Sequence, residues 1–230
     1  MTNFFNESFF AGVTISLLAY LLGMALKKKF KLGILNPLLI SIVFTILVLV
    51  IAHVDYETYN RGATYLSWFL TPATVCLAIP LYEQWQLLKE NLKAVLLSIL
   101  AGVITSLTTI FILAKILHLS HREYISLLPK SITTAIGMGL SEELGGYVTI
   151  TVAVIVITGV LGNILGEFVC KIFRITHPIA KGLAFGSSAH AIGTAKAMEI
   201  GEIEGAMSSL AIAVTGILTV LLASVFAPLI

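Results

Sequence analysis

The sequence predicts an all-α integral membrane protein, and three observations support this fold class. The 230-residue chain is 58% hydrophobic and only 11% charged, whereas a soluble domain has about 25% charged residues. Six apolar segments approach or exceed the roughly 20 residues that a helix needs to span a bilayer. Two polar, glycine-rich segments, 127–146 and 181–201, accompany them. We therefore expect one membrane domain, 1–230, with about six transmembrane helices plus two re-entrant or broken-helix polar segments.

The six apolar segments follow one another with few charges between their ends. They are residues 8–26, 34–52, 64–82, 94–116, 148–169 and 206–229. The fourth contains only Lys115 and the fifth only Glu167, each near the end of its segment, and the other four contain no charged residue. The first segment lacks the basic leader and small-residue cleavage site of a secretory signal. It is therefore expected to remain as a membrane anchor.

The distribution of lysine and arginine predicts the orientation, because these residues collect in cytoplasmic loops. The cluster of lysines at 27–31 places the first loop inside and the N-terminus outside. If segment 127–146 enters the membrane and returns, nine basic residues are cytoplasmic and three external; if it crosses, Lys171, Arg174 and Lys181 fall outside. By the same reasoning segment 181–201 enters from the cytoplasm. We favour two re-entrant hairpins from opposite faces, with a broken helix that crosses the bilayer as the alternative.

The two polar segments, LLPKSITTAIGMGLSEELGG and KGLAFGSSAHAIGTAKAMEIG, resemble each other. At an offset of 56 residues Ser131 aligns with Ser187, and Glu143 with Glu199. Paired, glycine-interrupted segments of this kind indicate the substrate site of a transporter. Irregular backbone at membrane depth must be buried in protein or line a watery cavity. The two hairpin tips are therefore expected to meet at one cavity near the middle of the membrane.

A third segment, around Pro72, echoes the same pattern more faintly. At an offset of 116 residues Thr71 aligns with Ser187, and Glu83 with Glu199. This alignment would make 1–117 and 118–230 a pair of inverted repeats of the transporter type.

The side chains of these segments favour a small carboxylate as ligand. Hydroxyl groups both donate and accept hydrogen bonds, and helix N-termini and lysines attract anions. The candidate substrate-binding residues are Lys130, Ser131, Thr133, Thr134, Glu143, Ser187, Ser188, His190, Thr194, Lys196 and Glu199, with Pro72, Thr74 and Asn163 as additional cavity candidates. His190 could carry a coupled proton or could be a buried, hydrogen-bonded histidine. Lys130 could instead snorkel to the interface, and Lys196 with Glu199 could form only an ion pair.

Glycines are expected to have two roles. In the polar segments they would let backbone amides approach a ligand, at Gly137, Gly139, Gly186 and Gly193. In the fifth apolar segment they would let helices approach closely, at Gly159, Gly162 and Gly166.

Several classes of function lack sequence support. The chain has neither the HExxH motif of zinc hydrolases nor the GxSxG motif of serine hydrolases, and we expect no enzyme activity. Cys76 and Cys170 indicate neither a disulfide nor a metal pair, so no metal or cofactor is expected. The lysine cluster follows the cytoplasmic-loop rule, so it gives no support to nucleic-acid binding.

Three long blocks resemble the LrgB/CidB family. They are IAKGLAFGSSAHAIGTAKAMEIGEIEGAMSSLA, starting at Ile179, LLPKSITTAIGMGLSEELGG, starting at Leu127, and LTPATVCLAIPLY, starting at Leu70. The resemblance covers essentially the whole chain but does not separate the LrgB from the CidB branch. It implies a multi-pass protein of the bacterial cell membrane, antiholin-like, that modulates murein hydrolase activity, autolysis and programmed cell death. It also implies a small holin-like LrgA/CidA-type partner, and a homo-oligomer is a further expectation.

Other members of this family are implicated in carboxylate transport. A plastid relative exchanges glycolate and glycerate, and some bacterial pairs are associated with pyruvate uptake. Together with the polar segments, this resemblance leads us to expect a transporter of small monocarboxylates such as pyruvate, glycolate or lactate. The alternative is a non-transporting, antiholin-like regulator that acts with the holin-like partner.

Overall fold

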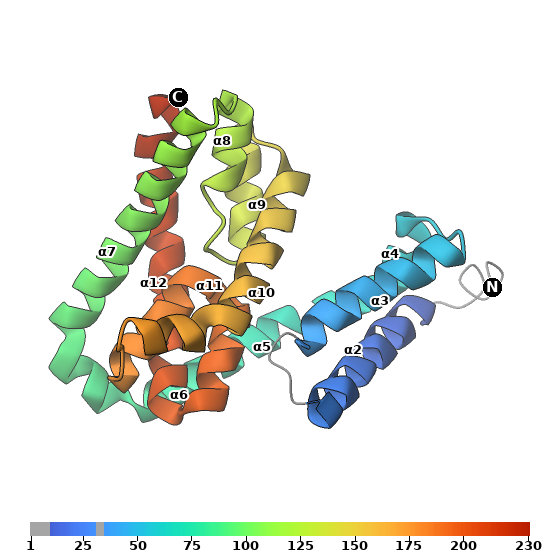
Figure 1. Cartoon of the computed structure of the whole chain (residues 1–230), viewed down its shortest axis with the longest axis horizontal. Coiled ribbons are helices and arrows are strands. Elements are labelled where there is room, and N and C mark those ends of the chain that lie inside the picture. Colours follow the sequence, from blue (N-terminus) through green and yellow to red (C-terminus); the bar gives the residue numbers. More distant parts are fainter. Residues whose placement is uncertain (1–9, 31–34) are drawn as a thin grey trace. The chain divides into compact units, whose positions relative to one another are not determined.

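The computed structural model describes residues 10–30 and 35–230, except for the side chains of Leu70 and Thr74 (Figure 1). In these residues all regular structure is helical. The chain divides into two compact units, Met1–Cys76 and Leu77–Ile230. This division does not fall between the proposed repeats 1–117 and 118–230, which stay a prediction. Ser8, Lys31 and Ile34, which belong to predicted segments, lie outside the described residues.

The first unit contains α2 (Ala11–Phe30), α3 (Pro37–Ile51), α4 (Tyr56–Ser67) and α5 (Leu70–Cys76). Helix α2 packs against both α3 and α4. Glycines on α2 allow this, because a Cβ at Gly12 would collide with the backbone of Tyr59 and Ala63 of α4. Ser16 and Tyr59 join the same pair of helices through their hydroxyls, 2.7 Å apart.

Helical structure in this region extends beyond the third apolar segment and is interrupted within it. Most of residues 53–63, between the second and third apolar segments, are helical, because α4 begins at Tyr56, where the side chain of Asp55 accepts a hydrogen bond from the Thr58 amide at 2.8 Å. The expected span 64–82 lies within the helical run Tyr56–Glu83, which is long and apolar enough to cross a membrane and is subdivided into α4, α5 and α6 (Ala78–Glu83). Prolines inside the segment, Pro72 and Pro80, remove backbone donors and disfavour an uninterrupted helix.

The predicted fold class is confirmed. Five helical runs among the described residues are long and apolar enough to span a membrane: Ala11–Phe30, Tyr56–Glu83, Trp85–Ile116, Val148–Ile172 and Glu202–Leu229. The shorter apolar helix Pro37–Ile51 corresponds to the second predicted segment. The protein is therefore an all-α integral membrane protein.

Three long helices frame the second unit: α7 (Trp85–Ile116), α10 (Val148–Ile172) and α12 (Glu202–Phe226). Helix α7 runs beside α12 (Figure 1). Lys89 and Lys93 precede the fourth apolar segment in sequence, and both belong to α7, which has 32 residues. A helix of this length extends about 48 Å, well beyond the roughly 30 Å apolar core of a bilayer. The two lysines can therefore remain helical and still reach the polar interface.

The first polar segment forms a hairpin of two helices, α8 (His121–Leu127) and α9 (Thr134–Glu143), joined by residues 128–133. Ser120 begins α8 with a capping box that it shares with Glu123. The entrance and exit of the hairpin are tied together, since Arg122 Nε donates to the Gly145 carbonyl at 3.0 Å. The Tyr147 amide donates to Ser126 Oγ at 2.7 Å. The chain thus leaves and returns at the N-terminal end of α10.

The second polar segment forms a hairpin from one broken helix, α11 (Pro178–Ile200). The helix breaks at Ala189 and His190, whose backbone angles are non-helical. A Cβ at Gly193 would lie 2.6 Å from the Phe185 carbonyl oxygen, whereas residues eight apart in a straight helix are about 12 Å apart. The chain therefore reverses at the break, and Lys181 and Ile200 line one cavity at the C-terminal end of α10. The two hairpins thus enter from opposite ends of α10.

Candidate functional site

The tips of the two hairpins approach the same stretch of α7. Ser131 Oγ of the first hairpin lies 3.4 Å from Ser106 Oγ. Ser187 Oγ of the second lies 3.4 Å from the position of a Cβ on Gly102. Gly102 and Ser106 are one helical turn apart, about 6 Å along α7. Ser106 precedes the end of α7, Ile116, by about 15 Å, which is half the thickness of a bilayer core.

The hairpins also approach the same residue of α10. His190 Nε2 lies 3.0 Å from the Ile155 carbonyl oxygen, which can only accept, so the ring nitrogen donates. On the first hairpin, a Cβ at Gly137 would collide with the Ile155 side chain. Ile136 beside it contacts α12, since its Cδ1 lies 3.0 Å from a Cβ position on Gly216. Both hairpins therefore contact α7 and α10 at neighbouring positions, and a cavity shared by their tips stays a prediction.

Lys130 brings a positive charge to the tip of the first hairpin. Its side chain is partly buried, and Nζ donates to Ser131 Oγ at 2.9 Å. In the part of the chain that the structure describes, no carboxylate forms an ion pair with it. Helix α9 begins four residues after Lys130, and its N-cap residue Thr133 makes no side-chain capping bond. A lysine, a serine hydroxyl and a helix N-terminus together form an environment that favours an anion.

His190 forms the turn of the second hairpin. Its side chain is 3% exposed, and its backbone adopts φ 42° and ψ −138°, a conformation rare for residues other than glycine. Glycine in α10 makes room for the ring, because a Cβ at Gly159 would lie 2.7 Å from His190 Cε1. The ring bond to Ile155 and this close packing hold the strained turn in place.

The hydroxyls of the second hairpin mostly bond within the protein. Ser187 and Ser188 donate to the carbonyls of Leu183 and Ala184, one turn back in α11. Thr194 is fully buried, donates to the His190 carbonyl at 3.0 Å and lies 2.7 Å from Ser208 Oγ of α12. Thr194 therefore fixes the returning half of the hairpin against α12.

Lys196 forms two ion pairs. Its Nζ lies 3.3 Å from Glu199 Oε2, which confirms the pair suggested by the sequence spacing. A shorter pair, at 2.7 Å, joins Lys196 to Glu167 of α10. The sequence did not indicate this second pair, because the two residues are 29 positions apart, and the Glu167 side chain remains 44% exposed. The presence of one carboxylate in an otherwise uncharged segment was the signal that could have found it.

The remaining candidates lie away from the tips or serve packing. Glu143 is exposed near the exit of the first hairpin, whereas Thr134 is half-buried at the start of α9. Asn163 Nδ2 donates to the Ile192 carbonyl at 2.9 Å and so connects α10 with the second hairpin. Pro72 is exposed on α5 in the first unit, and the side chain of Thr74 lies outside the described residues.

The glycines divide differently from the expectation. Three glycines that were expected to expose backbone to a ligand instead permit close packing. Gly137 packs on Ile155, Gly186 packs on α12, and Gly193 packs on the other arm of its own hairpin. Gly139 alone among the four has open space around it. In α10 the predicted close approach is confirmed, because a Cβ would collide with the second hairpin at Gly159, Gly162 and Gly166.

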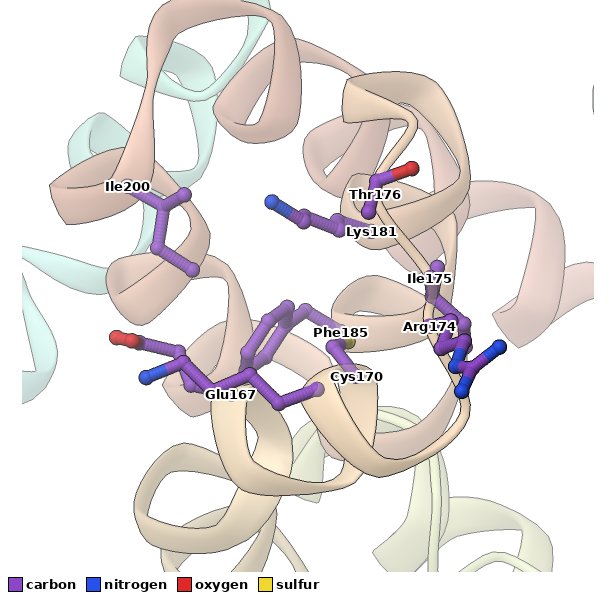
Figure 2. Close-up of a pocket in the computed structure, with 9 residues that line it drawn as sticks. Glu167, Cys170, Arg174, Ile175, Thr176, Lys181, Phe185 and Ile200 are labelled. Carbon is purple, nitrogen blue, oxygen red and sulfur yellow. The ribbon is translucent and has the colours of Figure 1, made fainter.

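Two cavities lie between α10 and α11, of about 400 Å³ and 260 Å³. The first is lined by residues of the C-terminal end of α10 and the two ends of the hairpin (Figure 2). The second reaches Ser188, near the hairpin tip. Neither is lined by a residue of the first hairpin. These cavities are therefore not the shared one expected between the tips.

Comparison with known proteins places the chain in a family. The model of the LrgB-like family matches residues 16–229. The antiholin-like protein LrgB of Bacillus subtilis (strain 168) is 41% identical over 220 residues, which cover 95% of each chain. The protein of the same name from Bacillus cereus (strain B4264) is 40% identical and covers 95% of this chain and 96% of its own. No solved structure matches. With the family pattern running through all the apolar helices and both hairpins, the chain is a multi-pass membrane protein that belongs to the LrgB-like family.

Proposed function

We propose that the protein transports small monocarboxylates, such as pyruvate, glycolate or lactate, across the bacterial cell membrane, with its N-terminus outside. The observation that carries this proposal is Lys130, a partly buried cation near mid-depth with only the Ser131 hydroxyl as its hydrogen-bond partner among described residues. A lysine at the centre of a membrane costs about 2.5–3.5 kcal/mol on insertion scales. A negatively charged substrate would supply the missing counter-charge.

The other tip residues fit the same role. Ser131 is 5% exposed and lies between Lys130 and Ser106 of α7. Thr134 begins α9, whose N-terminal amides favour a carboxylate. Opposite them, His190 is the candidate for carrying a coupled proton, since imidazole is the side chain that titrates near neutral pH.

Proteoliposomes test the proposal. Purified protein would be assayed for uptake of labelled pyruvate and glycolate, with Lys130→Met as the central variant. Loss of a charge-assisted hydrogen bond costs about 1.5–3 kcal/mol, so we expect apparent affinity to fall about 10- to 100-fold. Lys130→Arg keeps the charge, and Lys115→Met removes a lysine at the end of α7; both should retain flux. Unchanged uptake in Lys130→Met, with the protein folded and inserted, would overturn the assignment.

Thr134→Ala and His190→Ala extend the test to the other groups. Both should impair uptake while membrane insertion is kept. Because His190 also forms the turn, His190→Gly serves as its matched control, since glycine adopts the same backbone angles without strain. Low flux in both variants would assign the loss to the imidazole, whereas recovery in His190→Gly would assign it to the backbone.

A second candidate function follows from the names of the relatives, which are antiholin-like proteins. Here the protein would control murein hydrolase activity and autolysis through a small holin-like LrgA/CidA-type membrane partner, with no flux of its own. Reconstitution with and without that partner separates the two ideas. Carboxylate uptake supports transport, and control of autolysis would then follow from carboxylate and proton movement. Absence of flux in both conditions, with retained binding of the partner, supports the regulator.

A further inference from the structure

Three cations surround the cavity at the C-terminal end of α10. Lys171, Arg174 and Lys181 line it together with one carboxylate, that of Glu167. Glu167 also pairs with Lys196, whose Nζ lies 2.7 Å from Oε1. The three lining cations and one carboxylate leave a surplus of two positive charges. In Figure 2 the ammonium group of Lys181 extends into the space between the helices.

The floor of this cavity is apolar. Cys170 and Phe185 form it with Ile175 and Ile200, and the four residues belong to one small buried cluster. Figure 2 shows Cys170 beside the ring of Phe185. The second cavity, of about 260 Å³, shares Cys170, Ile175 and Phe185 with the first and extends to Ser188. A charged rim thus leads over an apolar floor towards the tip of the second hairpin.

The preference of basic residues for cytoplasmic ends accounts for their presence at this end of α10, but not for their arrangement. Lys171 and Arg174 end α10, whereas Lys181 comes from the first turn of α11, and all three border the same space. A volume of about 400 Å³ lies in the range of small-molecule sites.

We propose that this cavity, here called the basic mouth, binds small carboxylates with a short apolar chain and admits them to the second hairpin. The carboxylate would lie against Lys181 and Lys171, and its apolar part would lie on Phe185 and Cys170. The nature of the ligand rests on the proposed transport function, whereas the anion site itself does not. An anionic lipid headgroup carries the same kind of charge, and the experiment distinguishes the two sources.

Cys170 is a native reporter for the basic mouth. In a Cys76→Ser background it is the one remaining thiol. In phosphatidylcholine nanodiscs, its modification by an anionic and a cationic methanethiosulfonate of similar size would be compared, each rate normalised to a free small thiol. A unit charge near contact changes a local concentration about fivefold even in water. We therefore expect the anionic reagent to react at least fivefold faster, and pyruvate to slow it.

Variants of Lys181 test whether the preference for the anionic reagent arises in the basic mouth. Lys181→Met should reduce the preference for the anionic reagent about fivefold, whereas Lys181→Arg and the distant Lys115→Met should keep it. Equal normalised rates for the two reagents in the wild type would overturn the anion site. If phosphatidylglycerol in the nanodisc slows modification and pyruvate has no effect, the ligand is a lipid headgroup and the carboxylate assignment falls. Anion preference without uptake in proteoliposomes would overturn transport alone, and uptake without anion preference would overturn the basic mouth alone.

Discussion

The docking of the second hairpin on α12 depends on two glycines, and replacing one of them gives a sharp test of the structure. Gly182 and Gly186 lie one turn apart on α11 and face Glu204 and Ser208, one turn apart on α12. A Cβ at Gly186 would collide with the Ser208 carbonyl oxygen and lie 2.9 Å from Ser208 Cα and 2.7 Å from Ala211 Cβ. Because two of these atoms belong to the backbone, the helices must separate to accept a methyl group.

The expected cost of Gly186→Ala follows from three contributions. Alanine gains about 1 kcal/mol over glycine in a helix interior. Overpacking a close interface costs about 1–3 kcal/mol. Separating the helices also strains the 2.7 Å bond between Thr194 and Ser208, a hydrogen bond worth about 1 kcal/mol. The net expectation is a loss of about 2 kcal/mol in the free energy of unfolding, equivalent to roughly 4–8 °C in Tm for a chain of this size.

Gly139→Ala is the matched control. Gly139 lies inside α9, and a Cβ there would meet nothing within 4 Å. Only the helix-propensity gain remains, so this variant should be as stable as the wild type or more stable by up to about 1 kcal/mol. Melting curves of the two purified variants in the same detergent would be compared. If Gly186→Ala melts no lower than Gly139→Ala, the close contact between α11 and α12 is refuted.

Three further predictions concern polar groups. Replacing either Lys196 or Glu167 should lower the free energy of unfolding. In a double-mutant cycle measured by thermal unfolding, the double variant should lose less than the sum of the two single losses, with a coupling energy of about 0.5–3 kcal/mol. Thr194→Val should lower the free energy of unfolding by about 1–3 kcal/mol, because it leaves a buried hydroxyl of α12 unpaired, whereas Thr194→Ser should keep most of it. The serine of the α8 capping box holds the pKa of Glu123 below its usual value. The first amides of α8 should therefore be protected from hydrogen exchange above the unfolded-state pKa of Glu123, and this protection should be lost as the pH falls through its folded-state pKa. Glu123→Gln should abolish this pH dependence.

The apolar helices could be predicted from the sequence because their signal is local. A run of residues such as 206–229 carries its own hydropathy, and no partner is needed to recognise it. The same locality explains why the helices at 56–67 and 85–116 extend beyond the apolar segments. Helical hydrogen bonding continues past the apolar core, and hydropathy measures only the core. Segment 64–82 contains Pro72 and Pro80, each of which can kink or end a helix. The sequence does not show which of these two outcomes occurs, so the division into α4, α5 and α6 could not be predicted.

The hairpins could be predicted because charge placement reports on connectivity. If the first polar segment crossed the membrane, Lys171, Arg174 and Lys181 would lie on the external side. In the structure, the first hairpin instead leaves and returns at the N-terminal end of α10. Partners across the fold could not be predicted in this way. Nothing in a single sequence joins Lys196 to Glu167, or shows whether a glycine faces a ligand or a neighbouring helix. Both depend on the angle at which α10, α11 and α12 cross.

Helix α10 carries both hairpins, and this determines how variants should be interpreted. Its N-terminal part holds the first hairpin through Thr151, which is buried and bonded to the Ser126 carbonyl and to Ser141 Oγ. Its middle and C-terminal part holds the second through the glycines and Asn163. Ile155 contacts both. A substitution in the middle of α10 therefore displaces two sets of tip residues at once, and a loss of uptake there cannot be assigned to either. Lys130 lies on its own hairpin, so a variant at this position changes one tip alone.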